Sequence, residues 1–199
     1  MPSDRFYKLK QVKKRTFLKM AYKEFALHSY EGASITRLMG DLKMAKGSIY
    51  QYFEDKQDLY LYLVEHAHQQ LHDVVRKTCP TPHSEDNFNA WFSNLLLIQL
   101  KFLMAVPAYT SLFIKHSAEY EMGAKLSFME APIEEASRVT NTNIPIEKAF
   151  YLNNLPFLVF DFILQSEKID LYETIKSDLS IAIPTDKLLY LCEAFFKKA

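Results

Sequence analysis

Apolar side chains recur at helical spacing along most of this 199-residue chain. Phe17, Ala21 and Phe25 lie four residues apart with Leu18 beside them, which is the spacing of one face of an α-helix over about residues 13–29. The lysines between them fall mostly off this face. The pattern therefore predicts an amphipathic helix with a basic outer side.

Two shorter apolar stripes follow. Ser34 is a good N-cap, because its hydroxyl can accept a hydrogen bond from a free backbone N–H two or three residues on. After a turn at Lys43–Met44, a third short helix is predicted to run to about Phe53. The residues of the second stripe are Ile35, Leu38, Met39 and Leu42.

Asp55 can cap a fourth, longer helix, whose predicted buried face is Leu59, Leu63, Ala67, Leu71 and Val74. A polar, Pro-containing break follows at Thr78–Asn87. The later predicted helices are 88–105, 107–116, 118–140, 145–166 and 184–198, with an ambiguous segment at 167–183. Since only four glycines occur in the whole chain, a sheet-rich fold is disfavoured. We predict an all-α protein of about nine helices.

Composition narrows the class of protein. Half of the residues, 49%, are hydrophobic, enough for a large core, but no apolar run approaches the ~20 residues of a membrane span. Cys79 and Cys192 make no disulfide framework. With a charged N-terminus and no secretory signal, these features predict a cytoplasmic protein.

The net charge of zero hides an asymmetry. Residues 1–60 hold 12 Lys and Arg against 7 Asp and Glu, whereas residues 61–199 hold 12 against 17. A positive first third suits a polyanion such as nucleic acid. Chance fluctuation of the charges is the alternative.

The stretch "MAKGSIYQYFEDK" (44–56) is too polar for a buried helix and too aromatic for a loop. Two short helices across a tight turn form a helix-turn-helix, whose second helix enters the major groove of DNA. Ile49 and Phe53, one turn apart, would face inward. That leaves Lys46, Ser48, Tyr50, Gln51 and Tyr52 to meet DNA, with Gly47 allowing close approach of backbone N–H groups to a phosphate.

Residues 15–59 resemble the DNA-binding domain of TetR-type transcriptional regulators. The shared features are Ala21 and Phe25, the cap Ser34, and the signature "KGSIYQYFEDKQDL" from Lys46 to Leu59. The resemblance implies a helix-turn-helix domain over residues 1–56 and a larger helical effector-binding and dimerisation domain over residues 57–199. The sequence has no Gly-rich phosphate loop, so we expect no enzyme activity, cofactor or metal.

The resemblance also implies roles for individual residues. Thr36 and Arg37 would touch phosphate or the groove edge, and Lys56 would hold a phosphate. The recognition helix would present Lys46, Gly47, Ser48, Tyr50, Gln51 and Tyr52.

Three residues depart from the family pattern. Ser29 and Lys43 stand where turn glycines are usual, and left-handed backbone at such sites costs ~1–2 kcal/mol each. Ala45 replaces the usual serine cap, at a cost of ~1 kcal/mol. We expect a weakened domain whose recognition helix sits at an altered angle.

One recognition helix contacts few base pairs, so a dimer on a palindromic operator is expected. The resemblance implies a homodimer through helices 145–166 and 184–198, with Pro156 kinking the first or leaving one C=O free. The alternative is that helix 145–166 is a central buried helix that makes no dimer contact.

The resemblance further implies a repressor, released by a small apolar or amphipathic effector bound in the C-terminal domain. Aromatics at helical spacing line a pocket or fill a core, and both alternatives stay open here. The candidate effector-binding residues are Trp91, Leu95, Gln99, Phe102, Tyr109, Phe113, His116, Asn153 and Phe157.

One histidine pair has the spacing of a possible metal site. His68 and His72, with Glu65 and Asp73 near, share a helix face, but a solvated face explains them better than a metal site. A helical lipid-binding or small-molecule-binding protein without DNA-binding activity is the main alternative to a regulator. Attachment to a membrane surface is disfavoured because the C-terminal part is acidic.

Overall fold

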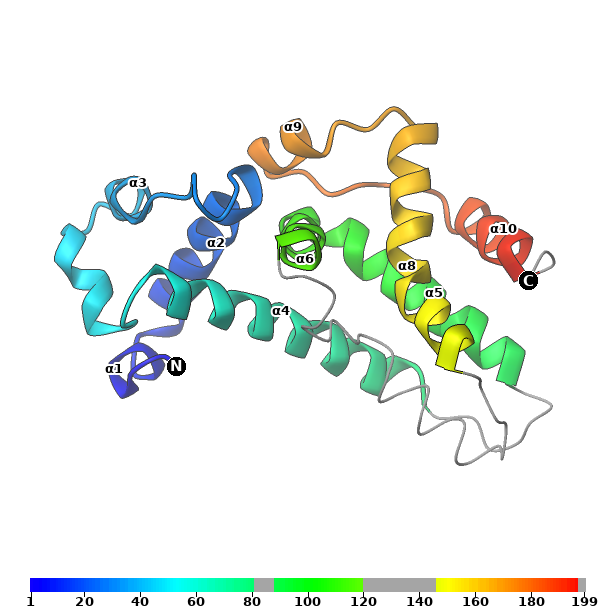
Figure 1. Cartoon of the computed structure of the whole chain (residues 1–199), viewed down its shortest axis with the longest axis horizontal. Helices are drawn as coiled ribbons and strands as arrows, with labels where there is room; N and C mark the ends of the chain where they lie inside the picture. The colour runs from blue at the N-terminus through cyan, green and yellow to red at the C-terminus, as the bar shows by residue number, and fades with distance from the viewer. Residues whose placement is uncertain (81–87, 120–145, 197–199) are drawn as a thin grey trace.

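The computed structural model describes residues 1–80, 88–119 and 146–196, and within them all regular structure is helical. These residues form ten helical segments, against about nine expected. The N-terminal helices lie at one end of the molecule and the C-terminal helices at the other (Figure 1). Most of the helix expected over residues 118–140 lies outside the described residues.

The N-terminal end contains α1 (Asp4–Tyr7), α2 (Gln11–Leu27), α3 (Ile35–Asp41) and the short 3₁₀ helix η1 (Lys46–Gln51). The apolar stripe predicted on α2 is buried, since Phe17, Ala21 and Phe25 are at most 2% exposed. The sequence pattern did not predict α1. Its Phe6 is fully buried between the rings of Phe17 and Phe53, at centroid distances of 5.6 and 4.9 Å.

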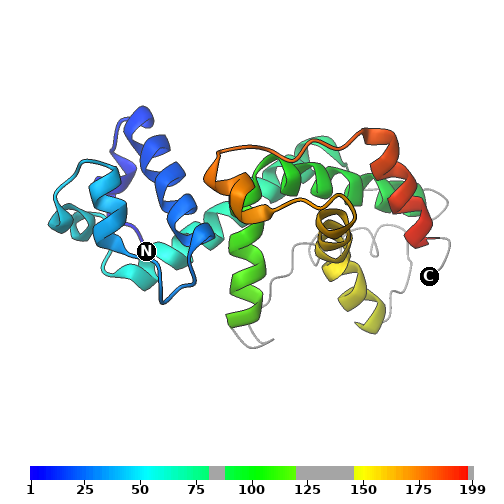
Figure 2. The ribbon, with the colours of Figure 1, turned by 90° about the horizontal axis from the view of Figure 1, so that it is seen from above.

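The long helix α4 (Lys56–Thr78) runs from the N-terminal helices toward the C-terminal ones, as Figure 2 shows from above. The predicted cap of α4 is confirmed, because Asp55 Oδ1 accepts a hydrogen bond of 2.8 Å from the Asp58 N–H. The predicted exposure pattern was wrong at one position: Val74 is 37% exposed and Val75 is buried. The buried face continues by four-residue steps from Leu71 to Val75 and on to Cys79, which lies against Trp91 of the next helix.

The C-terminal end consists of α5 (Phe88–Ala105), α6 (Pro107–Glu119), α8 (Ile146–Ser166), α9 (Leu171–Lys176) and α10 (Thr185–Phe196). Helices α4, α6, α8 and α10 all pack on α5, which is why α5 is apolar on nearly every side. One continuous cluster of buried side chains extends from Phe6 to Leu188. Helix α6 packs on α2, so the two ends of the molecule share this core.

Three helices end in a left-handed residue that is not glycine. Lys43, Lys168 and Asp178 have φ of 54°, 54° and 56° and follow α3, α8 and α9. After α3, the Lys43 N–H bonds to Gly40 O at 2.9 Å and the Met44 N–H bonds to Met39 O at 2.9 Å, the two bonds of a Schellman motif. The same pair of bonds closes α8 and α9.

Among the described residues, no single helix has the length and apolar composition needed to cross a membrane. Helices α5 and α6 meet that test of length and composition only when taken together, and they are bent by 102° at Val106.

Candidate nucleic-acid interface

The helix-turn-helix predicted from the sequence is formed by α3, the Schellman turn at Lys43 and η1. Ser34 caps α3 as predicted, with its Oγ accepting a hydrogen bond of 3.2 Å from the Arg37 N–H. Leu38 and Met39 on α3 and Ile49 on η1 are each 1% exposed. The two segments are therefore held together by a shared apolar face.

The second segment is a 3₁₀ helix rather than the α-helix expected up to Phe53. It has six residues, which is long for a 3₁₀ helix, and it follows Ala45, an N-cap residue whose side chain makes no cap hydrogen bond. Gly47 adds conformational freedom, and a Cβ built on it would meet nothing within 4 Å. The missing cap and the glycine are the local reasons why the shorter, tighter helix forms here.

The side chains of η1 divide into a buried and an exposed set. Ile49 and the following Phe53 are buried, as predicted. Tyr50 is 57% exposed, Lys46, Gly47 and Gln51 are exposed as well, and Ser48 is half-buried. A lysine, a phenol and an amide thus lie on the outer face of η1, which is the chemistry that meets phosphates and base edges.

Tyr52 differs from the other predicted recognition residues. It is half-buried, and its ring lies edge-on to Phe6 and Phe17 at centroid distances of 6.1 and 6.4 Å. Ser3 also holds the end of η1, since its N–H bonds to Tyr52 O at 2.8 Å and its hydroxyl to Gln51 O at 2.6 Å. The N-terminal segment thus fixes the end of η1 through these two hydrogen bonds.

Thr36 and Arg37 are exposed on the first turn of α3, as a groove-edge role requires. The Arg37 guanidinium also binds Glu24 of α2, with Nε donating to Oε2 at 2.9 Å and Nη2 donating to Oε1. Glu24, which is 7% exposed, accepts a third hydrogen bond of 2.7 Å from the Ser34 N–H. Burial acts to raise the pKa of Glu24, but these hydrogen bonds outweigh it and hold the pKa below its usual value. The ion pair orients α3 on α2.

Lys56, predicted to hold a phosphate, points into the loop between α2 and α3. Its ammonium donates to Tyr30 O, Glu31 O and Ala33 O at 2.7, 3.3 and 3.3 Å and lies 4.6 Å from the centre of the Tyr30 ring. An ammonium has three N–H groups, so a phosphate contact requires that one of these bonds be given up. That contact stays a prediction.

The three departures from the family pattern have different outcomes. The left-handed backbone expected at Lys43 is present, and the cap expected to be missing at Ala45 is missing. The expectation for Ser29 was wrong, because the positive φ angles of the described non-glycine residues fall on other positions. Helix α2 instead ends in extended backbone at His28, and Ser29 Oγ accepts the Gly32 N–H at 3.1 Å.

The predicted effector residues lie in and around the core of the C-terminal end. Trp91, Leu95, Gln99 and Phe113 are buried. The half-buried ones are Phe102, Tyr109 and Phe157. His116 and Asn153 lie outside the residues whose side chains are described.

Gln99 is the most informative of these residues. It is 1% exposed, and neither Nε2 nor Oε1 of its amide has a hydrogen-bond partner within the described part of the chain. A buried amide without partners costs about 1–3 kcal/mol for each unsatisfied group. Such a group in a native core calls for a bound water or ligand.

Sequence reasoning missed the residues that join α6 to α2. Lys115 of α6 donates to Phe25 O, Ala26 O and His28 O at the C-terminus of α2, and the Ser111 hydroxyl donates to Ala26 O at 2.9 Å. A cation there also offsets the negative end of the helix dipole. A lysine directly after the apolar run 112–114 was the available signal, but its partners lie about 90 residues away.

A capped α3, a tight left-handed turn and the exposed face of η1 define a helix-turn-helix protein. Residues 17–63 match the model of the "Bacterial regulatory proteins, tetR family". The HTH-type transcriptional repressor AcnR of Corynebacterium diphtheriae is 29% identical over 114 residues, 53% of this chain and 57% of that protein. AcnR of Corynebacterium glutamicum is 27% identical over 143 residues, 67% of this chain and 72% of that protein.

The fold likeness extends further along the chain. The crystal structure of a TetR family transcriptional regulator from Chloroflexus aurantiacus superposes with a TM-score of 0.73 and 22% identity, covering all of this chain and 96% of that one. Residues 17–63 of this chain therefore resemble the DNA-binding part of TetR family regulators, and the fold of the whole chain is similar to that of a regulator of this family. The chain's match spans little more than half the length of the first curated repressor.

Proposed function

We propose that this protein is a transcriptional repressor that binds a palindromic DNA operator as a dimer and is released by a small molecule. The observation that carries the proposal is the outer face of η1, where Tyr50, Gln51 and Lys46 are exposed while Ile49 holds the helix to the core. Residues 1–56 would form the DNA-binding unit and residues 57–199 the effector-binding and dimerisation unit. A cytoplasmic location belongs to the same proposal.

The proposed DNA contacts divide by chemistry. Lys46, the backbone N–H groups around Gly47, and Thr36 with Arg37 would contact phosphates and fix the register. Gln51 suits adenine, whose N6 and N7 pair with an amide, and Tyr50 presents a ring for a thymine methyl. The less exposed residues of the predicted set would contact the sugar-phosphate backbone of DNA; they are Ser48, Tyr52 and Lys56.

A gel shift with the DNA that flanks its own gene tests this proposal. Lys46→Ala and Tyr50→Ala should each weaken binding by about 5- to 150-fold, because each removes a contact of ~1–3 kcal/mol. The shift of the unchanged chain should weaken with salt. Lys77→Ala and Tyr172→Ala are matched controls, since both residues are exposed at other places. No salt-sensitive shift with any flanking DNA would favour the alternative, a helical small-molecule-binding protein without DNA-binding activity.

We propose dimerisation through α8 and α10. Each of these two helices carries two exposed large apolar side chains, 40–71% exposed, namely Leu158 and Phe162 on α8 and Leu189 and Tyr190 on α10. Phe162→Glu should convert a dimer to a monomer in sedimentation velocity, whereas Tyr172→Glu on α9 should not. A chain that stays dimeric with Phe162→Glu would place the interface elsewhere.

We propose the C-terminal core around Gln99 as the effector site. Mainly apolar walls with one unpaired amide suit an apolar or amphipathic molecule that carries a single hydrogen-bonding group. The bonds of Lys115 and Ser111 to the end of α2 give a route by which movement of α6 would displace the DNA-binding helices. Gln99→Leu should abolish the response of the gel shift to the effector and leave DNA binding in its absence intact.

A further inference from the structure

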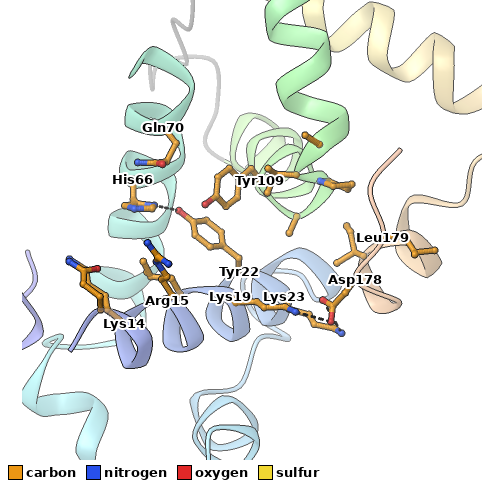
Figure 3. A pocket seen from close by; sticks show the side chains of 17 residues that line it. Lys14, Arg15, Lys19, Tyr22, Lys23, His66, Gln70, Tyr109, Asp178 and Leu179 are labelled. Carbon is orange, nitrogen blue, oxygen red and sulfur yellow. Dashed lines mark hydrogen bonds and ion pairs between the residues drawn. The ribbon is translucent and has the colours of Figure 1, made fainter. Parts of the chain in front are cut away.

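A cavity lies where the N-terminal helices meet the C-terminal ones. It has a volume of about 520 Å³ and is lined by α2, α4, the start of α6 and the end of α9 (Figure 3). Ligand sites in proteins have volumes of roughly 300–1,000 Å³. Gln99, the centre of the proposed effector site in the C-terminal core, does not line this cavity, although Tyr109 of the predicted effector set does.

The α2 wall of the cavity is strongly basic. Lys14, Arg15, Lys19 and Lys23 line it, against a single carboxylate, Asp178. Asp178 pairs with two of these cations, lying 3.2 Å from Lys19 Nζ and 3.5 Å from Lys23 Nζ. Within the described residues, neither Lys14 nor Arg15 has an ion-pair partner, and Lys14 Nζ lies 5.0 Å from the ring centres of both Phe6 and Tyr7.

The lining also contains three uncharged or weakly basic rings, those of Tyr22, His66 and Tyr109. The Tyr22 hydroxyl donates to Leu63 O at 2.8 Å and lies 2.8 Å from His66 Nδ1, and the rings of Tyr22 and Tyr109 are 4.2 Å apart. Figure 3 shows Arg15, Tyr22, His66 and Tyr109 grouped together on one side of the cavity. Burial, with Lys14 nearby, lowers the pKa of His66.

The rest of the lining is apolar. Leu18 of α2, Val106 and Pro107 at the start of α6, and Ile175 and Leu179 around α9 complete the walls. A cavity with a basic side and an apolar side matches a molecule that has one anionic group and an apolar body. Arg15 and Lys19 remain exposed, so the basic side of the cavity is open to solvent, while α6 and α9 pack against α2 and close its other side.

We propose that this cavity binds a small organic anion, a carboxylate or phosphate monoester with an apolar body. Arg15 pairs with the anionic group in a bidentate manner, with Lys14 close by, and Leu18, Val106 and Leu179 contact the body. Because the occupant touches α2 on one side and α6 and α9 on the other, it bridges the two ends of the molecule. This inference does not depend on DNA binding.

Isothermal titration of the full-length protein with 2-naphthoate and 2-naphthamide tests the proposal without DNA. The two probes share their shape and differ in charge, so we expect the carboxylate to bind about tenfold more tightly or better, as charged hydrogen bonds allow. Arg15→Gln should weaken 2-naphthoate binding by about tenfold or more. Lys13→Gln, which removes an exposed cation from the same helix outside the lining, should leave it unchanged.

A third variant tests the apolar side of the cavity. Leu179→Asp places a negative charge at a 61% exposed position, which the fold tolerates, and should abolish 2-naphthoate binding. The proposal is overturned if 2-naphthoate gives no binding heat up to millimolar concentration, if both probes bind equally, or if Arg15→Gln binds like the unchanged chain. A gel shift that fails while the titration succeeds would reject the regulator function and leave this site standing.

Discussion

Glu24→Gln is the sharpest test of how α3 is held in place. The carboxylate accepts hydrogen bonds from the Ser34 N–H, from Arg37 Nε and from Arg37 Nη2. A glutamine keeps the shape but removes the charge and turns one acceptor into an N–H donor that faces the guanidinium. Only the amide oxygen of the glutamine can then accept hydrogen bonds.

The expected cost follows from the burial of the two partners. Breaking a fully buried ion pair costs about 3–5 kcal/mol. The Glu24 side chain is 6% exposed but that of Arg37 is 44% exposed, so the freed guanidinium regains water. We therefore expect Glu24→Gln to lower the free energy of unfolding by about 2–3 kcal/mol at pH 7.

The effect should depend on pH in a defined direction. Because the pKa of Glu24 is lowered in the folded state, its stabilisation is complete above the unfolded pKa of about 4.3 and is lost as the pH falls through the lower folded pKa. Glutamine does not titrate. The difference in stability between the two chains should therefore narrow as the pH is lowered from 5 toward 3.

Urea unfolding followed by far-UV circular dichroism between pH 7 and the lowest pH at which the unchanged chain is folded measures both quantities. Glu31→Gln, at an exposed position in the adjacent loop, is the control and should change stability by less than about 0.5 kcal/mol. A loss below about 1 kcal/mol at pH 7, or a difference that stays constant with pH, would refute the assigned role of the pair.

Three further variants test local features by the same unfolding measurement. Lys115→Met should cost about 1.5–3 kcal/mol, because it removes the charged donor from three carbonyls at the end of α2, whereas the exposed Lys101→Met should cost little. Lys43→Gly should stabilise the protein by about 1 kcal/mol, since φ is 54° there, while the same change at Lys13 inside α2 should destabilise it by a similar amount. Ala45→Ser should add about 1 kcal/mol by supplying the cap that η1 lacks, and no gain would mean that η1 cannot use a side-chain cap.

Much of the fold was predictable because its signals are local. Ser34 and Asp55 cap the helices at which the sequence placed them, and the apolar stripe of α2 is buried as its spacing predicted. The exposure of Tyr50 was predicted as well, since Ile49 and Phe53 take the inward face. Caps and helical periodicity act within one or two turns, which is why a single sequence reveals them.

Helix endings were harder to predict because the usual glycine is absent. Three Schellman motifs have a non-glycine residue at the left-handed position, namely Lys43, Lys168 and Asp178. Helix ends are usually predicted from a glycine at that position, so these three give no signal in the sequence. Ser29, the position that the family pattern pointed to, adopts no such conformation. The cost of a left-handed lysine is offset by backbone bonds and packing around it, and those form only in the folded chain.

The sequence by itself determined the longer helices, the caps at Ser34 and Asp55, and the apolar stripe of α2, but it did not reveal α1 or α9. Tertiary structure alone decided that Lys56 and Lys115 bond to carbonyls far along the chain, and that the basic face of α2 lies opposite the start of α6. The cavity there draws its walls from four segments between residues 11 and 179. Contacts of this kind depend on how helices pack in three dimensions, and no spacing along one chain encodes them directly.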